Sequence, residues 1–147
     1  INCRNIMYEG YTRQALPSKK YRELLGSAIC VFNSNNNFII ENVLRGDGCQ
    51  KYTWRNLIDR VSGMLSDPIR ETITAKAGPE IQKLFEDVID KRNRIIHSFQ
   101  ITDKDGEQRL ATKHKDGSQE IISESYLIDF IKLNECLSDK LHGFRGY

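Results

Sequence analysis

Three polar side chains stand close together in the stretch DKRNRIIHSF (residues 90–99): Arg92, Asn93 and His97. On a helix, Asn93 and His97 are four residues apart and share one face, and Arg92 lies about 100° from Asn93 around the axis. Histidine can accept or release a proton near neutral pH. Arginine carries a permanent charge on a planar fork that suits phosphate oxygens, and asparagine can hold either group by hydrogen bonds. With no carboxylate pair or metal cluster nearby, the set indicates metal-independent phosphodiester chemistry on RNA, whose own 2′-hydroxyl is the nucleophile.

A helix must position these residues, and the sequence predicts one that begins at Pro79 and Glu80. Proline suits the first turn of a helix, and an acidic residue there interacts favourably with the helix dipole. Arg92 stands where the helical period requires an apolar residue, which is unusual for a merely structural helix. The apolar residues of this stripe are Ile81, Leu84, Phe85, Val88, Ile89, Ile95, Ile96 and Phe99.

The stretch RNRIIH (Arg92 to His97) resembles the R-N-x-x-x-H form of the motif of HEPN domains, late in a bundle helix. The resemblance covers roughly residues 18–142. It implies a helical bundle that dimerises, so that two motifs form one composite ribonuclease cleft without a metal ion or other cofactor. It also implies that His97 is the acid–base residue, that Arg92 binds the scissile phosphate and that Asn93 orients them. Many HEPN proteins are toxins paired with an antitoxin, or effectors of abortive infection and anti-phage defence, and we expect a cognate antitoxin on this basis.

Composition restricts the class of protein. The net charge is only +2, from 22 Lys and Arg against 20 Asp and Glu, which argues against a protein that coats nucleic acid with a broad basic surface. No apolar run is long enough to span a membrane, and no signal peptide is visible. The cysteines are scattered and lack the paired spacing of a zinc site or disulfide framework. We therefore expect buried free thiols and a cytoplasmic location. The four are Cys3, Cys30, Cys49 and Cys136.

Three further helices follow from apolar spacing. The first begins at Pro17-Ser18, continues through NSNNN (residues 33–37) with Asn36 on its inner stripe, and ends before RGDG (residues 45–48); a kink at NSNNN is the alternative. The second has Thr53 as N-cap and Asp67-Pro68 at its end; a short helical turn is expected between Pro68 and Ala77. The last begins at Ser123 or Ser125 and is closed near Leu141 by His142-Gly143. Its stripe is Leu127, Phe130, Ile131, Asn134, Leu137 and Leu141, and that of the second helix is Trp54, Leu57, Ile58, Val61, Met64 and Leu65.

Residues 99–122 form a different kind of segment, in which Asp-Gly pairs at 105–106 and 116–117 separate short extended runs. Such pairs are a strong hairpin signal, so a two- or three-stranded meander is predicted. It contains a second R-x(4)-H spacing, from Arg109 to His114. Strand alternation would put these two side chains on opposite faces, so this pair is not expected to act together.

The predicted fold is mainly α, an antiparallel four-to-five-helix bundle with a small β-hairpin or meander insert before the last helix. Residues 1–147 are expected to form a single HEPN-like domain, in which 1–16 are a lead-in and 99–122 the insert. Trp54 is expected in the core or at a dimer interface, and Cys30 is expected to be buried. The residues expected to be solvated are Lys91, Arg94, His114 and His142.

The leading hypothesis is thus a homodimeric, metal-independent endoribonuclease with RNA as substrate and Arg92, Asn93 and His97 as its catalytic residues. One alternative is a non-catalytic HEPN-like module that binds nucleotide or RNA, or that serves for dimerisation. A plain interaction domain in which the motif is accidental is the third, with the three polar residues bonded to a neighbouring loop. RNA cleavage in the presence of EDTA, RNA binding without products, and a monomeric state would separate the three.

Overall fold

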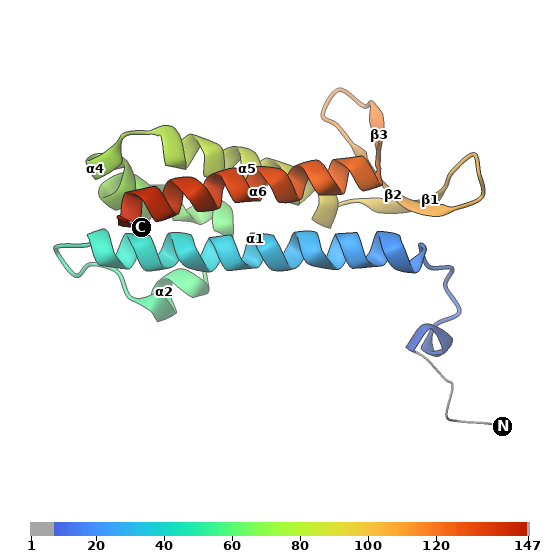
Figure 1. The fold of residues 1–147 in the computed structure, drawn as a ribbon, viewed down its shortest axis with the longest axis horizontal. Helices are drawn as coiled ribbons and strands as arrows, with labels where there is room; N and C mark the ends of the chain where they lie inside the picture. Colours follow the sequence, from blue (N-terminus) through green and yellow to red (C-terminus); the bar gives the residue numbers. More distant parts are fainter. Residues whose placement is uncertain (1–7, 147) are drawn as a thin grey trace.

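The computed structural model describes residues 8–146, which are mainly helical with a small antiparallel sheet before the last helix (Figure 1). Three helices are long: α1 (Lys19–Gly46), α5 (Glu80–Ile96) and α6 (Glu124–Arg145). The lead-in contains a 3₁₀-helix at Tyr8–Tyr11, and its first seven residues lie outside the described part. None of the described helices is both long enough and apolar enough to cross a membrane.

The directions of the long helices differ from a uniformly antiparallel bundle. Helix α5 runs against both of its long neighbours, whereas α1 and α6 are parallel (Figure 1). Two ion pairs, each at 3.2 Å, agree with the parallel direction of α1 and α6. Lys20 contacts Glu124 where both helices begin, and Glu41 contacts Arg145 near the ends of both. The segment between α1 and α5 consists of short pieces that stay at one end of the molecule. Only one long helix, α5, therefore runs back between α1 and α6, which makes these two parallel (Figure 1).

Capping residues explain where the long helices start. The Ser18 hydroxyl accepts the Tyr21 amide before α1, and the Ser123 hydroxyl accepts the Tyr126 amide before α6, as expected of N-caps. Helix α1 continues through the asparagine run as predicted, although it includes the residues up to Gly46. The predicted end of α6 at His142-Gly143 is wrong, because the left-handed residue that ends this helix is Gly146, with φ of +91°.

The core lies between the three long helices. Phe32 of α1 stacks on Phe85 of α5 and Phe130 of α6, each with 6.5 Å between ring centroids. A polar pair is buried beside them: the Asn35 amide nitrogen donates to the Asn134 backbone carbonyl at 2.8 Å and to its side-chain oxygen at 3.2 Å. The predicted inner position of Asn36 is wrong by one residue, because Asn35 is the buried one and Asn36 is only partly covered.

The second predicted helix is broken into short pieces, and its predicted apolar face is largely exposed. Thr53 is the N-cap as expected, but α2 (Trp54–Ile58) has five residues. A chain of short turns follows: the 3₁₀-helix η3 (Ser62–Leu65), α3 (Ser66–Ile69), the π-helix η4 (Arg70–Thr74) and α4 (Ala75–Ala77). Only Leu57 and Leu65 of the predicted stripe are buried, and Trp54 is half exposed, so its expected place in the core is wrong.

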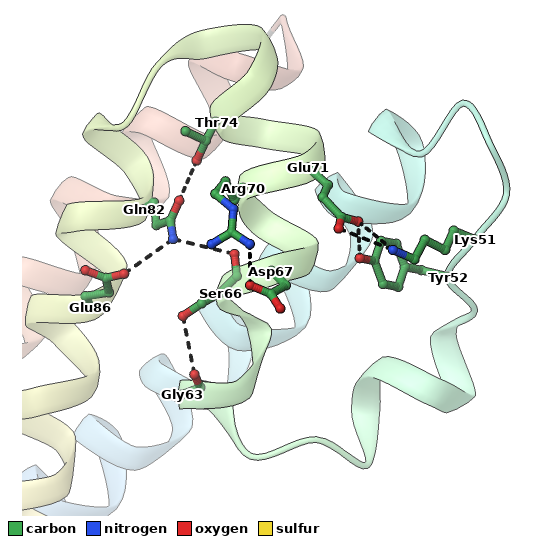
Figure 2. Close-up of polar contacts among 10 residues, drawn as sticks. All are labelled: Lys51, Tyr52, Gly63, Ser66, Asp67, Arg70, Glu71, Thr74, Gln82 and Glu86. Carbon is green, nitrogen blue, oxygen red and sulfur yellow. Dashed lines mark hydrogen bonds and ion pairs between the residues drawn. The ribbon is translucent and has the colours of Figure 1, made fainter.

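Polar contacts fasten this broken segment at one end of the molecule (Figure 2). The Thr74 hydroxyl donates to the side-chain oxygen of Gln82 on α5 at 2.8 Å, so η4 is tied to that helix. Glu71 accepts hydrogen bonds from the Tyr52 hydroxyl and the Lys51 ammonium group. These two bonds lower the pKa of Glu71 and hold the loop after α1 against the π-helix.

The predicted meander is confirmed. Strands β1 (Phe99–Thr102), β2 (Gln108–Lys113) and β3 (Gln119–Ile122) form one antiparallel sheet in sequence order. Its register pairs Phe99 with Ala111 and Leu110 with Ile122. Both turns contain the expected glycines at positive φ, Gly106 and Gly117. The sheet therefore projects from the end of the molecule where α5 stops and α6 begins (Figure 1).

Candidate functional site

Helix α5 carries the candidate residues in its final turns. Five apolar residues of its predicted stripe are buried, and Arg92 lies between the first four of them and the last, Ile95. The helix ends at Ile96, so His97 is its C-cap and its amide donates to the Asn93 carbonyl at 2.9 Å. The last two residues of the predicted stripe are exposed: Ile96 at 52% and, in β1, Phe99 at 40%. The motif thus lies at the junction of helix and sheet.

Arg92 is directed toward α1. Its guanidinium carbon lies 4.7 Å from the centroid of the buried Phe32 ring, within the range of a cation–π contact. Its Nε atom is buried and has no hydrogen-bond partner in residues 8–146. Burial lowers the pKa of Arg92, although an arginine remains charged at any physiological pH. The structure therefore holds a partly desolvated positive charge at this point.

Asn93 lies on another side of α5, in a pocket of about 390 Å³ between the helix, the β2–β3 turn and the start of α6. Its neighbours there include Arg94, Lys115 and Tyr126. Neither Arg92 nor His97 lines this pocket.

The three candidate residues are adjacent in the chain but are not joined to one another. No side-chain hydrogen bond or ion pair links Arg92, Asn93 and His97 within the described residues. His97 is exposed at the end of the helix, while Arg92 packs on Phe32 and Asn93 borders the pocket. One chain by itself therefore does not bring the three side chains into one cleft. Arg92 and His97 lie in the last turns of α5, and Asn93 lies in a separate pocket.

The second R-x(4)-H pair is separated in space by different partners. The Arg109 guanidinium carbon lies 4.8 Å from the Tyr21 ring centroid, and its Nε is 3.8 Å from Asp103. His114 follows the end of β2, and its Nε2 lies 2.9 Å from a Glu120 oxygen. As expected, Arg109 and His114 do not form one site.

Seven pocket residues were not among the sequence-predicted site residues: Asp90, Lys91, Arg94, His114, Lys115, Glu120 and Tyr126. Arg94 is more than a solvated charge, because its Nη1 donates to the Lys113 carbonyl at 3.0 Å and ties α5 to the sheet. The sequence signal for Lys115 is a basic residue directly before an Asp-Gly turn. That signal could be used only if the turn were known to fold back over α5.

Several other expectations concern residues outside this site. The expectation of buried thiols is wrong, because Cys30, Cys49 and Cys136 are free but exposed, and Cys3 lies outside the described residues. Asn36 accepts a hydrogen bond from the Ser62 hydroxyl at 2.6 Å, on the side of α1 that faces η3. No group of three or more His, Cys, Asp or Glu residues in the described chain is arranged to hold a metal ion.

Comparisons with protein-family models, with curated proteins and with solved structures find no match for this chain.

Proposed function

We propose that the chain is a metal-independent endoribonuclease of the HEPN type that acts as a homodimer in the cytoplasm, as a toxin or anti-phage effector with a cognate antitoxin. In this proposal the long helices belong to a four-to-five-helix bundle of HEPN type. His97 exchanges protons with the RNA, Arg92 binds the scissile phosphate and Asn93 orients them. Two copies of the motif, one from each protomer, form the cleft.

The observation that carries this proposal is the environment of Arg92. A half-buried guanidinium whose Nε has no partner in the described chain has lost hydration without a compensating bond, which costs free energy. The side chain as a whole is only partly covered, so a phosphate at its accessible part would supply a charge of opposite sign. The exposed His97 lies just over one helical turn farther along, at the same end of α5.

The proposed reaction needs only proton transfer and charge stabilisation. One His97 imidazole takes the proton of the RNA 2′-hydroxyl, and the 2′-oxygen attacks the neighbouring phosphorus. The bond from phosphorus to the 5′-oxygen breaks, and an imidazolium, that of the partner copy in a composite cleft, protonates the leaving oxygen. Arg92 stabilises the negative charge that develops on the phosphoryl oxygens. The products are a 2′,3′-cyclic phosphate and a 5′-hydroxyl.

The test is cleavage of end-labelled RNA in excess EDTA by the native chain and by Arg92→Ala, His97→Gln and His142→Gln variants. Loss of a general acid–base residue should lower the rate by at least about 100-fold, so His97→Gln should be nearly inactive. His142 is the matched control, because it is also exposed but lies near the far end of α6. Full activity in His97→Gln, or complete inhibition by EDTA, would contradict the proposal. Circular dichroism checks that each variant is folded.

A second candidate function is a module that binds RNA or nucleotide, or that dimerises, without cutting. It is favoured by the separation of Asn93, inside a basic pocket, from Arg92 and His97. If this candidate is correct, RNA is retained by the native protein but no cyclic-phosphate ends appear at any protein concentration.

A further inference from the structure

The pocket beside Asn93 is built by three elements that are far apart in the sequence. Helix α5 contributes Asn93 and Arg94, the β2–β3 turn contributes His114 and Lys115, and α6 contributes Tyr126 from its first turn. The bond from Arg94 to the Lys113 carbonyl fixes the end of β2 beside α5. A volume of about 390 Å³ lies within the range of small-ligand pockets.

The charges in this pocket favour an anion. Lys91, Arg94 and Lys115 line it together with two carboxylates, Asp90 and Glu120. Glu120 is already engaged, because one of its oxygens lies 2.9 Å from His114 Nε2. Lysine and arginine side chains around a concave surface are the usual partners of phosphate oxygens.

Tyr126 gives the pocket an aromatic wall. Its hydroxyl makes no hydrogen bond within the described residues, so the ring is not fixed by a polar partner. Burial is the main cause of a raised pKa of Tyr126, with a further contribution from the nearby Glu120 carboxylate, and the phenol is therefore neutral at physiological pH. The ring also borders an adjoining hollow of about 420 Å³, which Phe130 and Leu133 line together with the charged residues Lys91, Glu120 and Asp129. A flat ring beside a basic pocket suits a ligand that has both phosphate and aromatic parts.

We infer that this pocket binds one nucleotide of single-stranded RNA, with its base against the Tyr126 ring and its phosphate at Lys91, Arg94 and Lys115. Asn93 links the pocket to the motif, so the bound nucleotide would be a neighbour of the one that is cut. This inference rests on the proposed ribonuclease function for its substrate. The insert between α5 and α6 thereby contributes Lys115 to RNA binding, while the two helices contribute the other contacts.

The size and chemistry of the pocket favour a nucleotide over a simpler anion. Inorganic phosphate would leave the Tyr126 face unused. A base in single-stranded RNA can leave its stack and lie on an aromatic side chain, which adds binding free energy with little dependence on sequence. Tyr126 supplies that side chain, and Asn93 supplies hydrogen-bonding groups at the pocket wall.

The experiment measures binding of a fluorescent RNA of about ten nucleotides, a typical length for a single-strand site. Its 2′-hydroxyls are methylated, so that it cannot be cut. Stacking on one aromatic ring is worth about tenfold or more in affinity, so Tyr126→Ala should weaken binding by at least that factor. Tyr126→Phe keeps the ring and should bind as the native chain does. If Tyr126→Ala fails to fold, Lys115→Gln carries the test, because Lys115 is exposed in a turn.

Lys115 has a matched control in the chain. Lys104 also stands directly before an Asp-Gly pair, in the β1–β2 turn, and it is exposed but does not line the pocket. Lys115→Gln should weaken binding and lower the dependence of affinity on salt by about one phosphate contact, whereas Lys104→Gln should do neither. Equal effects of the two substitutions would overturn the inference. So would displacement of the RNA by a phosphopeptide as readily as by a nucleoside monophosphate.

The two proposals fail in different ways. If unmethylated RNA is cut but Tyr126→Ala and Lys115→Gln bind the methylated RNA normally, the pocket inference is wrong and the ribonuclease proposal stands. If these variants lose binding while the native chain cuts no RNA, the pocket binds RNA and the ribonuclease proposal is wrong.

Discussion

At the scale of single residues, Tyr21 connects the first helix to the sheet. It is fully buried, its hydroxyl donates to the Ile122 carbonyl at 2.6 Å, and the same oxygen accepts the Leu110 amide at 3.1 Å. Tyr21→Phe would leave both backbone groups without this partner. We expect it to lower the free energy of unfolding by about 1–3 kcal/mol, measured by urea denaturation at neutral pH. An unchanged unfolding midpoint would show that these bonds contribute nothing net.

The same residue predicts a pH dependence. Burial raises the pKa of Tyr21 above its usual value of 10, despite the opposing effects of the Leu110 amide and the Arg109 guanidinium. Above pH 10 the phenol ionises more readily in the unfolded chain, so its contribution to stability is present below that pH and is lost as the pH rises. The stability difference between the native chain and Tyr21→Phe should therefore narrow above pH 10. A difference that stays constant or widens in urea titrations would contradict this.

Residue types predicted the candidate site only in part. The helical period showed that Arg92 stands within an apolar stripe, and in the structure the Arg92 side chain is half-buried. The pocket could not be predicted from the sequence, because Tyr126 and Lys115 come close to Asn93 only through contacts between distant segments.

The one-residue error between Asn36 and Asn35 has a local cause. Residues 33–37 are four asparagines and one serine, so this stretch contains no apolar residue that could fix the phase of the helical pattern.

At the scale of elements, pattern predicts long helices and fails for the segment between them. Residues 54–65 match a helical period, yet the helix stops after Ile58. Only Leu57 and Leu65 of the predicted stripe are buried, so a continuous helix here would lack the apolar burial that stabilises helices in proteins. The chain then turns several times between Ser62 and Ala77. Strong local signals did specify several boundaries: the serine and threonine caps and both Asp-Gly turns are where the sequence predicts them.

The two turns of the sheet provide a paired prediction. Gly106 and Gly117 both have φ near +90°, where a side chain is strained, and nothing lies within 4 Å of the Cβ that each would gain. Gly106→Ala and Gly117→Ala should each therefore cost about 1–2 kcal/mol through the backbone alone. Only Gly117→Ala should also weaken RNA binding, because its turn carries Lys115. Equal RNA affinities for the two variants would show that the β2–β3 turn does not contribute to the RNA-binding pocket.

At the scale of the whole molecule, a buried polar pair joins the parallel helices α1 and α6, and apolar spacing cannot predict it. Asn35 donates to Asn134, and Asn134 in turn donates to the Phe130 carbonyl at 2.9 Å. Asn35→Leu or Asn134→Leu alone should cost about 1–3 kcal/mol, since each leaves a buried polar group with fewer partners. The double variant should cost less than the two single costs added together. A double-mutant cycle in urea measures this, and strict additivity would contradict the coupling.

The last prediction concerns the assembly that the proposed function requires. A composite cleft needs two chains, so cleavage per chain should fall on dilution in proportion to the fraction of dimer measured by sedimentation.

Ile96 is the best position at which to test this interface by mutation, because it is 52% exposed and directly precedes His97. Ile96→Glu would place a charge at the proposed interface, where its desolvation opposes association. We expect a folded monomer that no longer cuts RNA. Val61→Glu is the control, because Val61 is also an exposed aliphatic residue, at 65%, and lies on the segment that contacts α1 through Ser62. A monomeric Ile96→Glu chain with full activity would show that one copy suffices, and the composite cleft would then be wrong even if the ribonuclease activity is real.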